Sequence, residues 1–148
     1  MRSAALVALA ALAVAAVPTA VHAQAPRIAH QPANGRPYSA AIQVGDTYWF
    51  SGKIGGSAET RALPQGERVQ AETHNIMRQF ETLFGELGMG WEDMVQATIY
   101  LVDLDDYGPM NEAYGSYFGA EPPARETVVV SELVAGAQIE ISFVGVKR

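Results

Sequence analysis

Arg125 is the residue whose sequence context best suits it to chemistry, because it stands at the start of a β-branched run. Pro122 and Pro123 end whatever element precedes it, and residues 126–131 predict a buried strand. The sheet would hold the guanidinium in place while its head reaches beyond the strand end. Arg125 could then present a planar, two-pronged donor to a small carboxylate. The alternative is an ordinary surface ion pair that does no chemistry.

The other titratable residues are weaker candidates. His74 falls near the polar face of a predicted helix, and no second His, Asp or Glu stands at a metal-ligand spacing on that face. We interpret His74 as a solvated side chain and predict no metal site. Asp105 and Asp106 precede a second predicted helix, where acidic side chains suit the helix dipole. We interpret them as caps and not as a catalytic carboxylate pair.

Composition excludes several classes of function. The 148 residues carry a formal net charge of −6 and contain no cysteine. An acidic chain lacks the cationic surface that binds nucleic acid or anionic membranes. Without cysteine there are no disulfides and no Cys-based metal or redox site. A small domain without disulfides can gain stability by forming oligomers.

Residues 1–23 have the pattern of a secretory signal peptide. Arg2 gives the basic start, residues 4–17 form an unbroken apolar run, and Ala23 ends a site of small residues. We predict cleavage after Ala23 and export, with the periplasm as the expected compartment and no membrane contact after cleavage. A retained N-terminal anchor is the alternative. The remaining 125 residues suffice for one domain, and loss of Arg2 changes the net charge from −6 to −7.

The rest of the chain predicts an α+β domain. Residues 24–37 are polar and rich in proline, and we interpret them as an extended lead-in, not a packed element. Apolar residues recur every three or four positions from Val69 to Leu87, which predicts a helix whose opposite face, including Glu72, is polar. The other predicted elements are a hairpin of 39–44 with 47–51, a strand 94–102, a helix 107–118, and strands 126–131 and 138–146. The order β-β-α-β-α-β-β places both helices on one face of a sheet, and a neighbouring subunit is expected to cover the other face.

Several motifs occur in an order that resembles the RidA family, also called YjgF or L-PSP proteins. The resemblance covers residue 37 to the C-terminus, which we assign as one RidA-like domain, residues 38–148. Its most specific part is Pro123-Ala124-Arg125 followed downstream by Ile139-Glu140-Ile141. The other matching motifs are Pro37-Tyr38, Phe50-Ser51-Gly52-Lys53-Ile54, Asn75, Leu87-Gly88, Trp91-Glu92-Asp93-Met94-Val95, Tyr100-Leu101-Val102-Asp103, Met110-Asn111-Glu112-Ala113-Tyr114 and Tyr117-Phe118.

The resemblance implies a chorismate-mutase-like fold and a homotrimer, with the sheets forming a central barrel and clefts lying between subunits. It also implies hydrolysis of reactive enamines and imines, of the 2-aminoacrylate or 2-imino acid type, to 2-keto acids and ammonia without metal or cofactor. Arg125 would grip the substrate carboxylate, and Glu140 would position the attacking water. The implied substrate-binding residues are Tyr38, Ser51, Gly52, Asn111 and Thr127.

Some of these residues have other possible roles. Glu140 can be a solvent-facing carboxylate on the polar face of its strand. Tyr38 can be a rim aromatic at the trimer interface, and Asn111 can hold local backbone at its helix. Each of these alternatives places the residue near the expected site without a contact to substrate.

Three positions depart from the family pattern. Thr127 stands where many members have a cysteine, Gly55 replaces a common proline, and Lys53 adds a positive charge near the expected pocket mouth. Export would also separate the protein from the cytoplasmic enzymes that produce enamines. The physiological substrate therefore stays open at this point.

Two further functions compete with the deaminase. One is a non-catalytic trimer that binds a small carboxylate in the same clefts, and the presence of both Arg125 and Glu140 favours the deaminase over it. The other is the ribonuclease activity with which the family was earlier associated. The acidic chain disfavours it, since there is no basic stripe or histidine pair.

Overall fold

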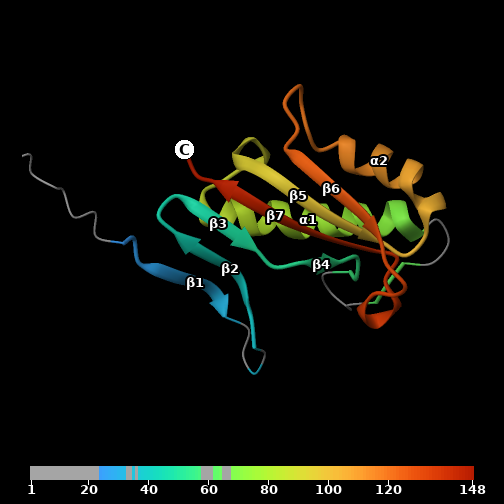
Figure 1. Ribbon diagram of the computed structural model, residues 1–148, viewed down its shortest axis with the longest axis horizontal. Helices are drawn as coiled ribbons and strands as arrows, with labels where there is room; N and C mark the ends of the chain where they lie inside the picture. The colour runs from blue at the N-terminus through green and yellow to red at the C-terminus, as the bar shows by residue number, and fades with distance from the viewer. Residues whose placement is uncertain (1–23, 33–34, 36, 58–61, 65–67) are drawn as a thin grey trace, which may run out of the picture.

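The computed structural model describes residues 24–32, 35, 37–57, 62–64 and 68–148, so the predicted signal peptide lies outside the described residues. No helix in this part of the chain is long and apolar enough to cross a membrane. The elements in chain order (Figure 1) are β1 (Arg27–Pro32), β2 (Ser39–Val44), β3 (Thr47–Phe50), β4 (Lys53–Ile54), α1 (Arg68–Leu87), the 3-10 turn η1 (Trp91–Asp93), β5 (Met94–Leu101), η2 (Leu104–Asp106), α2 (Tyr107–Gly115), β6 (Ala124–Val129), η3 (Val134–Gly136) and β7 (Ile139–Val146).

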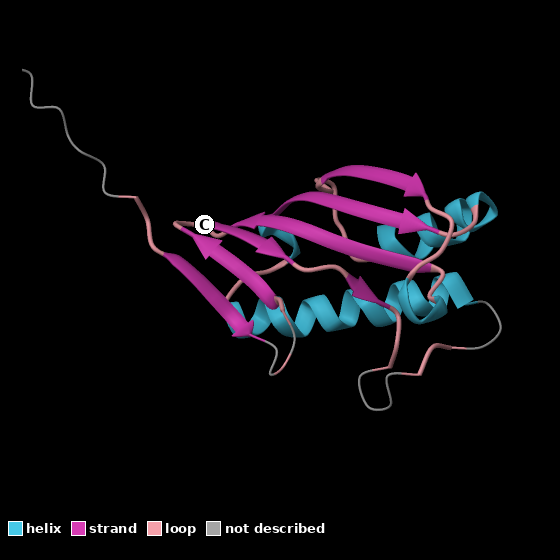
Figure 2. Ribbon diagram, turned by 60° about the horizontal axis from the view of Figure 1, so that its bottom comes forward, coloured by secondary structure: helices cyan, strands magenta, loops and turns pink. Residues whose placement is uncertain are grey.

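Seven strands form one sheet in the order β1-β2-β3-β7-β5-β6, and β4 also pairs with β7. Among the described strands only β5 and β6 run parallel, as expected for two strands joined by a helical crossover through α2. In Figure 2, α1 lies lengthwise along one face of the sheet. The predicted α+β class is confirmed. The structure has two strands that the sequence did not predict, β1 before the first hairpin and β4 after it.

The hydrophobic core lies between the sheet and the two helices. Ile139, Ile141 and Phe143 alternate along β7 and are buried, while the residues between them are half-buried. Phe143 meets Phe80 of α1 edge-on, with ring centroids 4.9 Å apart, and stacks with Tyr114 of α2 at 6.5 Å. Both helices therefore pack on the same face, which confirms the predicted layering.

α1 forms and ends where its residues require. The predicted apolar face is buried against the sheet, and Gly88 follows the last turn with a φ of +65°. This left-handed conformation closes a helix C-terminus readily only when the residue is glycine. Met89 N–H then donates to the Phe84 carbonyl at 2.9 Å, which satisfies one of the last carbonyls of the helix.

Two predicted segments differ in the structure. Residues 27–32 are not an unpacked lead-in, because β1 pairs along its length with β2, where His30 contacts Gln43 at 2.9 Å. The proline and polar residues of this segment are typical of a loop, and they are tolerated in β1 because it lies at the edge of the sheet. β6 is the opposite edge strand, and it is not buried, since Val128 and Val129 are half-exposed. A β-branched run identifies a strand without showing what covers it.

The acidic turn before α2 also differs from the prediction. Asp103 is the capping residue, and its Oδ1 accepts the Asp105 N–H at 3.0 Å. Asp106 precedes α2 without a side-chain cap hydrogen bond. Burial and the neighbouring carboxylates of Asp103 and Asp105 raise the pKa of Asp106, against the lowering effect of Arg68.

Candidate functional site

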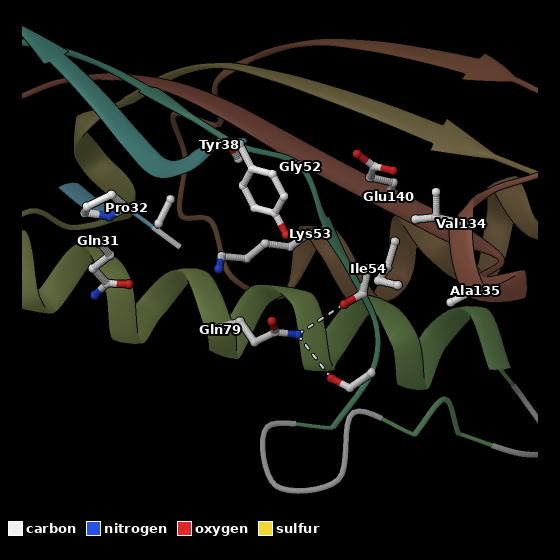
Figure 3. Close-up of a pocket in the computed structure, with 13 residues that line it drawn as sticks. Gln31, Pro32, Tyr38, Gly52, Lys53, Ile54, Gln79, Val134, Ala135 and Glu140 are labelled. Carbon is white, nitrogen blue, oxygen red and sulfur yellow. Dashed lines mark hydrogen bonds between the residues drawn. The ribbon is translucent and has the colours of Figure 1, made fainter. Parts of the chain in front are cut away.

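A hollow of about 870 Å³ opens beside β4 and is lined by residues of β4, β7 and α1. Four of the residues predicted to form the site line it together: Tyr38, Ser51, Gly52 and Glu140. Figure 3 shows Glu140 near one end with Val134 and Ala135, and Tyr38 and Lys53 nearer the other. We call these four residues the hollow set.

A bulge between β3 and β4 brings Gly52 under Glu140. Trp49 faces Val144 and Lys53 faces Ile141, so four steps along β3 and β4 match three steps along β7. The extra residue bends the strand, as bulges do next to functional sites. A β-carbon on residue 52 would overlap the Glu140 carboxylate. Glycine at this position leaves the space in which the carboxylate lies against the backbone.

Ser51 and Tyr38 have different positions in the hollow. The Ser51 hydroxyl donates to the Ser39 carbonyl at 2.7 Å, which ties β3 to the start of β2. Its proton is therefore engaged with backbone, and its oxygen can still accept. The Tyr38 side chain is 50% exposed, and Figure 3 shows its ring over the hollow close to Lys53.

Lys53 lines the hollow as well, with its ammonium 5.4 Å from the centroid of the buried Phe80 ring. Its strand neighbour Ile141 is a core residue, so Lys53 leaves β4 on the helix side, whereas Glu140 leaves β7 on the other side. The positive charge that the sequence placed near the pocket mouth is thus in the lining itself. It enters from the side opposite to Glu140.

Two polar residues of α1 fix the chain around β4. Gln79 Nε2 donates to the carbonyls of Ile54 and Gly56 at 3.2 Å each. Asn75 Nδ2 donates to the Gly55 carbonyl at 3.0 Å. Their spacing of four residues was the available signal, because it places both amides on one side of the helix.

Arg125 lies elsewhere, on β6 beside α2. Its Nη2 donates to the Tyr107 hydroxyl at 3.2 Å, and the guanidinium lies 5.7 Å from the centroid of that ring and 5.2 Å from that of Tyr114. Stacking against two rings restricts the guanidinium and leaves its other donors available. The sequence did not assign Tyr107 or Tyr114 to the site, although they lie seven residues apart on one helix face.

Asn111 and Thr127 belong to the same region as Arg125. Asn111 stands four residues after Tyr107 and three before Tyr114, so the helix places it between them. Thr127 follows Arg125 by two residues and therefore points to the same face of β6. Its Oγ1 is buried without a hydrogen-bond partner among the described residues. We call Arg125, Thr127 and Asn111 the α2–β6 set.

Tyr114, which lies beside Arg125, has its pKa altered by burial. The Tyr114 hydroxyl is buried and has no hydrogen-bond partner in the described part of the chain. Burial raises the pKa of Tyr114 well above its usual value, and the positive charge of Arg125 only partly opposes this. Tyr114 is thus neutral at any physiological pH and acts as an aromatic wall for the guanidinium.

Two predictions about α1 need correction. Glu72 is not on a solvated face, since its side chain is fully buried and bonded to Arg68 at 3.0 Å. His74 is not fully solvated, since it is half-buried and its Nδ1 lies 3.0 Å from the Tyr117 hydroxyl. Periodicity placed both correctly on the helix but could not show which loops cover them. Within the described residues no group of three or more His, Asp or Glu side chains is arranged to hold a metal ion.

Comparison with known proteins gives a consistent relationship. The family model described as Endoribonuclease L-PSP matches residues 28–147. A RutC family protein of Pyrococcus abyssi is 36% identical over 112 residues, covering 76% of this chain and 87% of the relative. The 2-iminobutanoate/2-iminopropanoate deaminase of Mus musculus is 32% identical over 116 residues, covering 78% and 85%.

Solved structures agree with this relationship. RidA from the Antarctic bacterium Psychrobacter superposes with a TM-score of 0.71 at 30% identity, covering 78% of this chain and 92% of that one. TdcF of E. coli with bound serine superposes with a TM-score of 0.71 at 25% identity, covering 76% and 90%. Family model, relatives and fold agree over nearly all of the described residues. The chain therefore belongs to the L-PSP family, the family of the RidA and YjgF proteins.

Proposed function

We propose that this protein hydrolyses reactive 2-imino acids and their enamine tautomers to 2-keto acids and ammonia. One observation carries the proposal: the fold presents two complementary half-sites, each with a group that this reaction needs. The α2–β6 set holds a restrained arginine for a carboxylate, and the hollow set holds a carboxylate for a water. The mouse relative, named for the deamination of 2-iminobutanoate and 2-iminopropanoate, supports the same chemistry.

The two half-sites imply an assembly of more than one copy. Arg125 pairs with Ala97 of β5 and Glu140 pairs with Tyr100, three residues further along the same strand. Side chains alternate along a strand, so Arg125 and Glu140 leave opposite faces of the sheet. In the proposed homotrimer, β6 of one subunit brings its arginine to the hollow of the next. Half-exposed Trp49 and Val128 on the helix-free face are apolar surface that such contacts would bury.

The proposed reaction uses few groups. Arg125 binds the substrate carboxylate through two parallel hydrogen bonds, and the unpartnered Thr127 hydroxyl donates a further one. Glu140 accepts a hydrogen bond from a water and takes its proton as the water oxygen bonds to the imine carbon and the C=N electron pair moves to nitrogen. That proton then passes to nitrogen to give a carbinolamine. The hydroxyl proton next moves to the nitrogen through Glu140 as the C=O bond forms and the C–N bond breaks, and ammonia leaves with the 2-keto acid. Holding water and imine together supplies most of the rate, because the imine carbon is already electrophilic.

The test is the decay of 2-iminopropionate that an amino-acid oxidase generates in situ, followed with and without the protein. We expect wild type to accelerate the decay and Arg125→Ala to lose the effect, with Arg125→Lys in between because a lysine cannot make the two-pronged contact. A matched control is Arg27→Ala, which removes an exposed arginine from the far edge strand β1. No acceleration by wild type would reject the deaminase.

A non-catalytic binder of small carboxylates is the second candidate, and the serine-bound relative favours it. Calorimetric titration with serine and with 2-oxobutyrate distinguishes the two functions when combined with the decay assay. Binding that depends on Arg125 without acceleration of imine decay would establish the binder. RNA cleavage is not proposed despite the family model's description, since the chain carries a net charge of −6.

Export belongs to the same proposal. Cleavage after Ala23 would give a mature chain that starts at Gln24, three residues before β1. Intact-mass measurement of the protein from a periplasmic extract tests this directly. A chain that still begins at Met1 would reject cleavage.

A further inference from the structure

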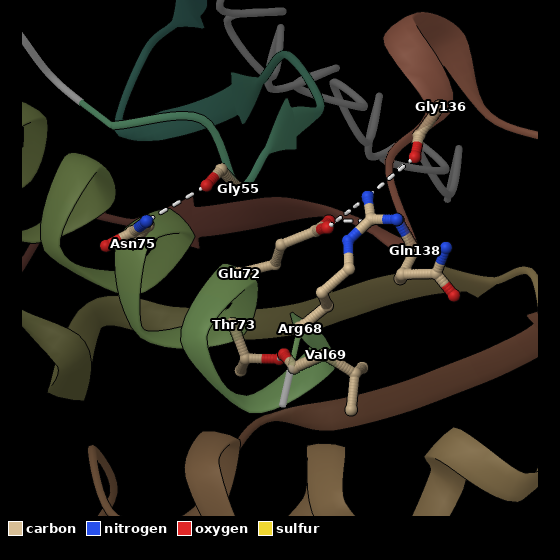
Figure 4. A network of polar contacts seen from close by, with 8 residues as sticks. All are labelled: Gly55, Arg68, Val69, Glu72, Thr73, Asn75, Gly136 and Gln138. Carbon is tan, nitrogen blue, oxygen red and sulfur yellow. Dashed lines mark hydrogen bonds and ion pairs between the residues drawn. The ribbon is translucent and has the colours of Figure 1, made fainter. Parts of the chain in front are cut away.

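Glu72 is a buried carboxylate on α1 whose two oxygens both carry structural bonds. Its side chain is fully buried, its Oε1 lies 3.0 Å from Arg68 Nη2, and its Oε2 accepts the Gln138 N–H at 2.9 Å. The same Arg68 Nη2 donates to the Gly136 carbonyl at 2.9 Å (Figure 4). One ion pair thus holds two backbone groups of the segment that leads into β7.

That segment forms a wall of the hollow. Val134 and Ala135 line it, Gly136 and Gln138 follow, and Glu140 comes two residues after Gln138. The Gln138 carbonyl accepts the Val102 N–H at 3.1 Å, so its backbone is held from both sides. Any shift of this peptide would be passed along β7 to the Glu140 carboxylate.

Beyond the Glu72–Arg68 pair, the turn that carries Val134 and Ala135 has few restraints of its own within the described residues. Val134 is 69% exposed, and Ala135 has a φ of +57°, a left-handed conformation that is unfavourable for a residue with a β-carbon. Such a conformation persists where the surroundings determine it, and it is common at functional sites. Within the described residues, the turn itself has two backbone hydrogen bonds, of 3.2 Å from Gly136 to Leu133 and of 3.3 Å from Ala137 to Val134.

The specific contribution of this pair is its bonds to backbone. Desolvation offsets much of the attraction between the buried Glu72 carboxylate and Arg68, whose side chain is 32% exposed, whereas an apolar pair could not bond to the Gln138 N–H and the Gly136 carbonyl. The close packing of Gly55 on this helix is also specific, because a β-carbon there would overlap the Cα and Cβ atoms of Glu72. Gly55 therefore lets the backbone after β4 approach α1 closely at Glu72.

We propose that Glu72 and Arg68 are positioning residues of the active site, which fix the wall at Val134 and Ala135 and, through Gln138, the direction of Glu140. This inference rests on the proposed deaminase function. It adds two residues that do not touch substrate and lie outside the hollow and the α2–β6 set. Removal of either partner of this pair also costs stability, so its effect on turnover is measured only where the variants are folded.

The test compares Glu72→Ala, Glu72→Gln and Arg68→Ala with wild type, at a temperature where circular dichroism shows every variant folded. Gln70→Ala is the matched control, because Gln70 lies on the same helix and contacts Glu112 at the surface. We expect Glu72→Ala and Arg68→Ala to lower kcat for 2-iminopropionate about 10-fold, as misplaced catalytic groups do, with KM changed less. Glu72→Gln keeps an acceptor for the Gln138 N–H and should recover most of the loss.

Hydrogen–deuterium exchange gives a readout that is independent of turnover. In Glu72→Ala the amides of Gly136 and Ala137 should exchange faster, although their acceptors in the turn are Leu133 and Val134, while the Gln70→Ala control leaves them unchanged. An inactive wild type would reject the deaminase and leave the exchange measurement to test the positioning role. Folded Glu72 variants with wild-type kcat and wild-type exchange would overturn the inference.

Discussion

Arg125 and Glu140, the two residues that act in the proposed reaction, leave opposite faces of the same sheet. Their strand neighbours on β5, Ala97 and Tyr100, fix this arrangement because they stand an odd number of residues apart. Arg125 rests on the aromatic rings of α2, and Glu140 rests on the backbone of Gly52. A site that uses both residues therefore draws them from two chains.

Complementation between inactive variants tests that arrangement. Arg125→Ala and Glu140→Gln should each be inactive alone, and coexpression should restore activity because a mixed trimer contains sites with one intact residue from each chain. Random mixing predicts about a quarter of the wild-type sites over all trimers, and about a third in the mixed trimers alone. The measurement is imine decay by protein carrying two different affinity tags. No recovery in tandem-purified mixed trimers would place both residues in one chain's site or outside the site.

Removing the charge of Glu140 should affect kcat more than KM. We expect Glu140→Gln to lower kcat by about 10²- to 10³-fold, since a general base typically contributes that much, and to leave carboxylate binding by Arg125 intact. Steady-state kinetics with 2-iminopropionate give both constants. Glu121→Gln, in the exposed loop before β6, is the control and should match wild type.

The hydroxyl of Tyr107 should restrain Arg125 in the binding geometry. Tyr107→Phe removes the 3.2 Å hydrogen bond and keeps the ring beneath the guanidinium. A hydrogen bond of this kind contributes about 1 kcal/mol, so we expect KM to rise by roughly 5-fold without a change in kcat. A fall in kcat at constant KM would instead give the hydroxyl a part in the chemical step.

Gly55 should be intolerant of any side chain. Gly55→Ala forces a methyl group against Cα and Cβ of Glu72, and overpacking of this kind costs about 1–3 kcal/mol of unfolding free energy. Urea denaturation measures the loss. Gly85→Ala provides the opposite control, because Gly85 is exposed on α1 with open space around it, and alanine there should stabilise the helix by about 1 kcal/mol.

Tyr114 should make the fold sensitive to alkaline pH. In the unfolded chain its hydroxyl ionises near pH 10.0, whereas burial raises its pKa in the folded state. Above pH 10 the unfolded state therefore binds fewer protons than the folded state, so stability falls as pH rises, by up to about 1.4 kcal/mol per pH unit. Tyr114→Phe should remove this slope and cost little at pH 7, because the hydroxyl has no hydrogen-bond partner in the described part of the chain. Unfolding curves from pH 8 to 11 would show an unchanged slope if another group were responsible.

The sequence predicted the elements better than their surroundings. The helix face from Val69 to Leu87 and the alternation along β7 follow directly from apolar spacing, and both are confirmed. β1 was not predicted because edge strands tolerate the proline and polar residues that usually indicate a loop. Glu72 appeared to be solvated because periodicity describes a helix without the loops that fold over it.

The same limit applies to the site. Motif order identified Glu140, Gly52, Ser51 and Tyr38, and the structure brings these four together. Arg125 is separated from them because of the sheet register. A shift of the register by one residue would move its side chain to the other face, and no local sequence pattern reveals the register. Tyr107 and Gln79 were missed because their roles are contacts with residues far away in the sequence.

Because Arg125 and Glu140 lie on opposite faces, the proposed activity should depend on protein concentration. A catalytic unit assembled from several chains dissociates on dilution, so specific activity should fall once the protein concentration drops below the dissociation constant of the assembly. Thermodynamic reciprocity then requires substrate to tighten the assembly by the same factor that assembly tightens substrate. Under the proposed export and reaction, the diluted protein would be held together in part by its own substrate.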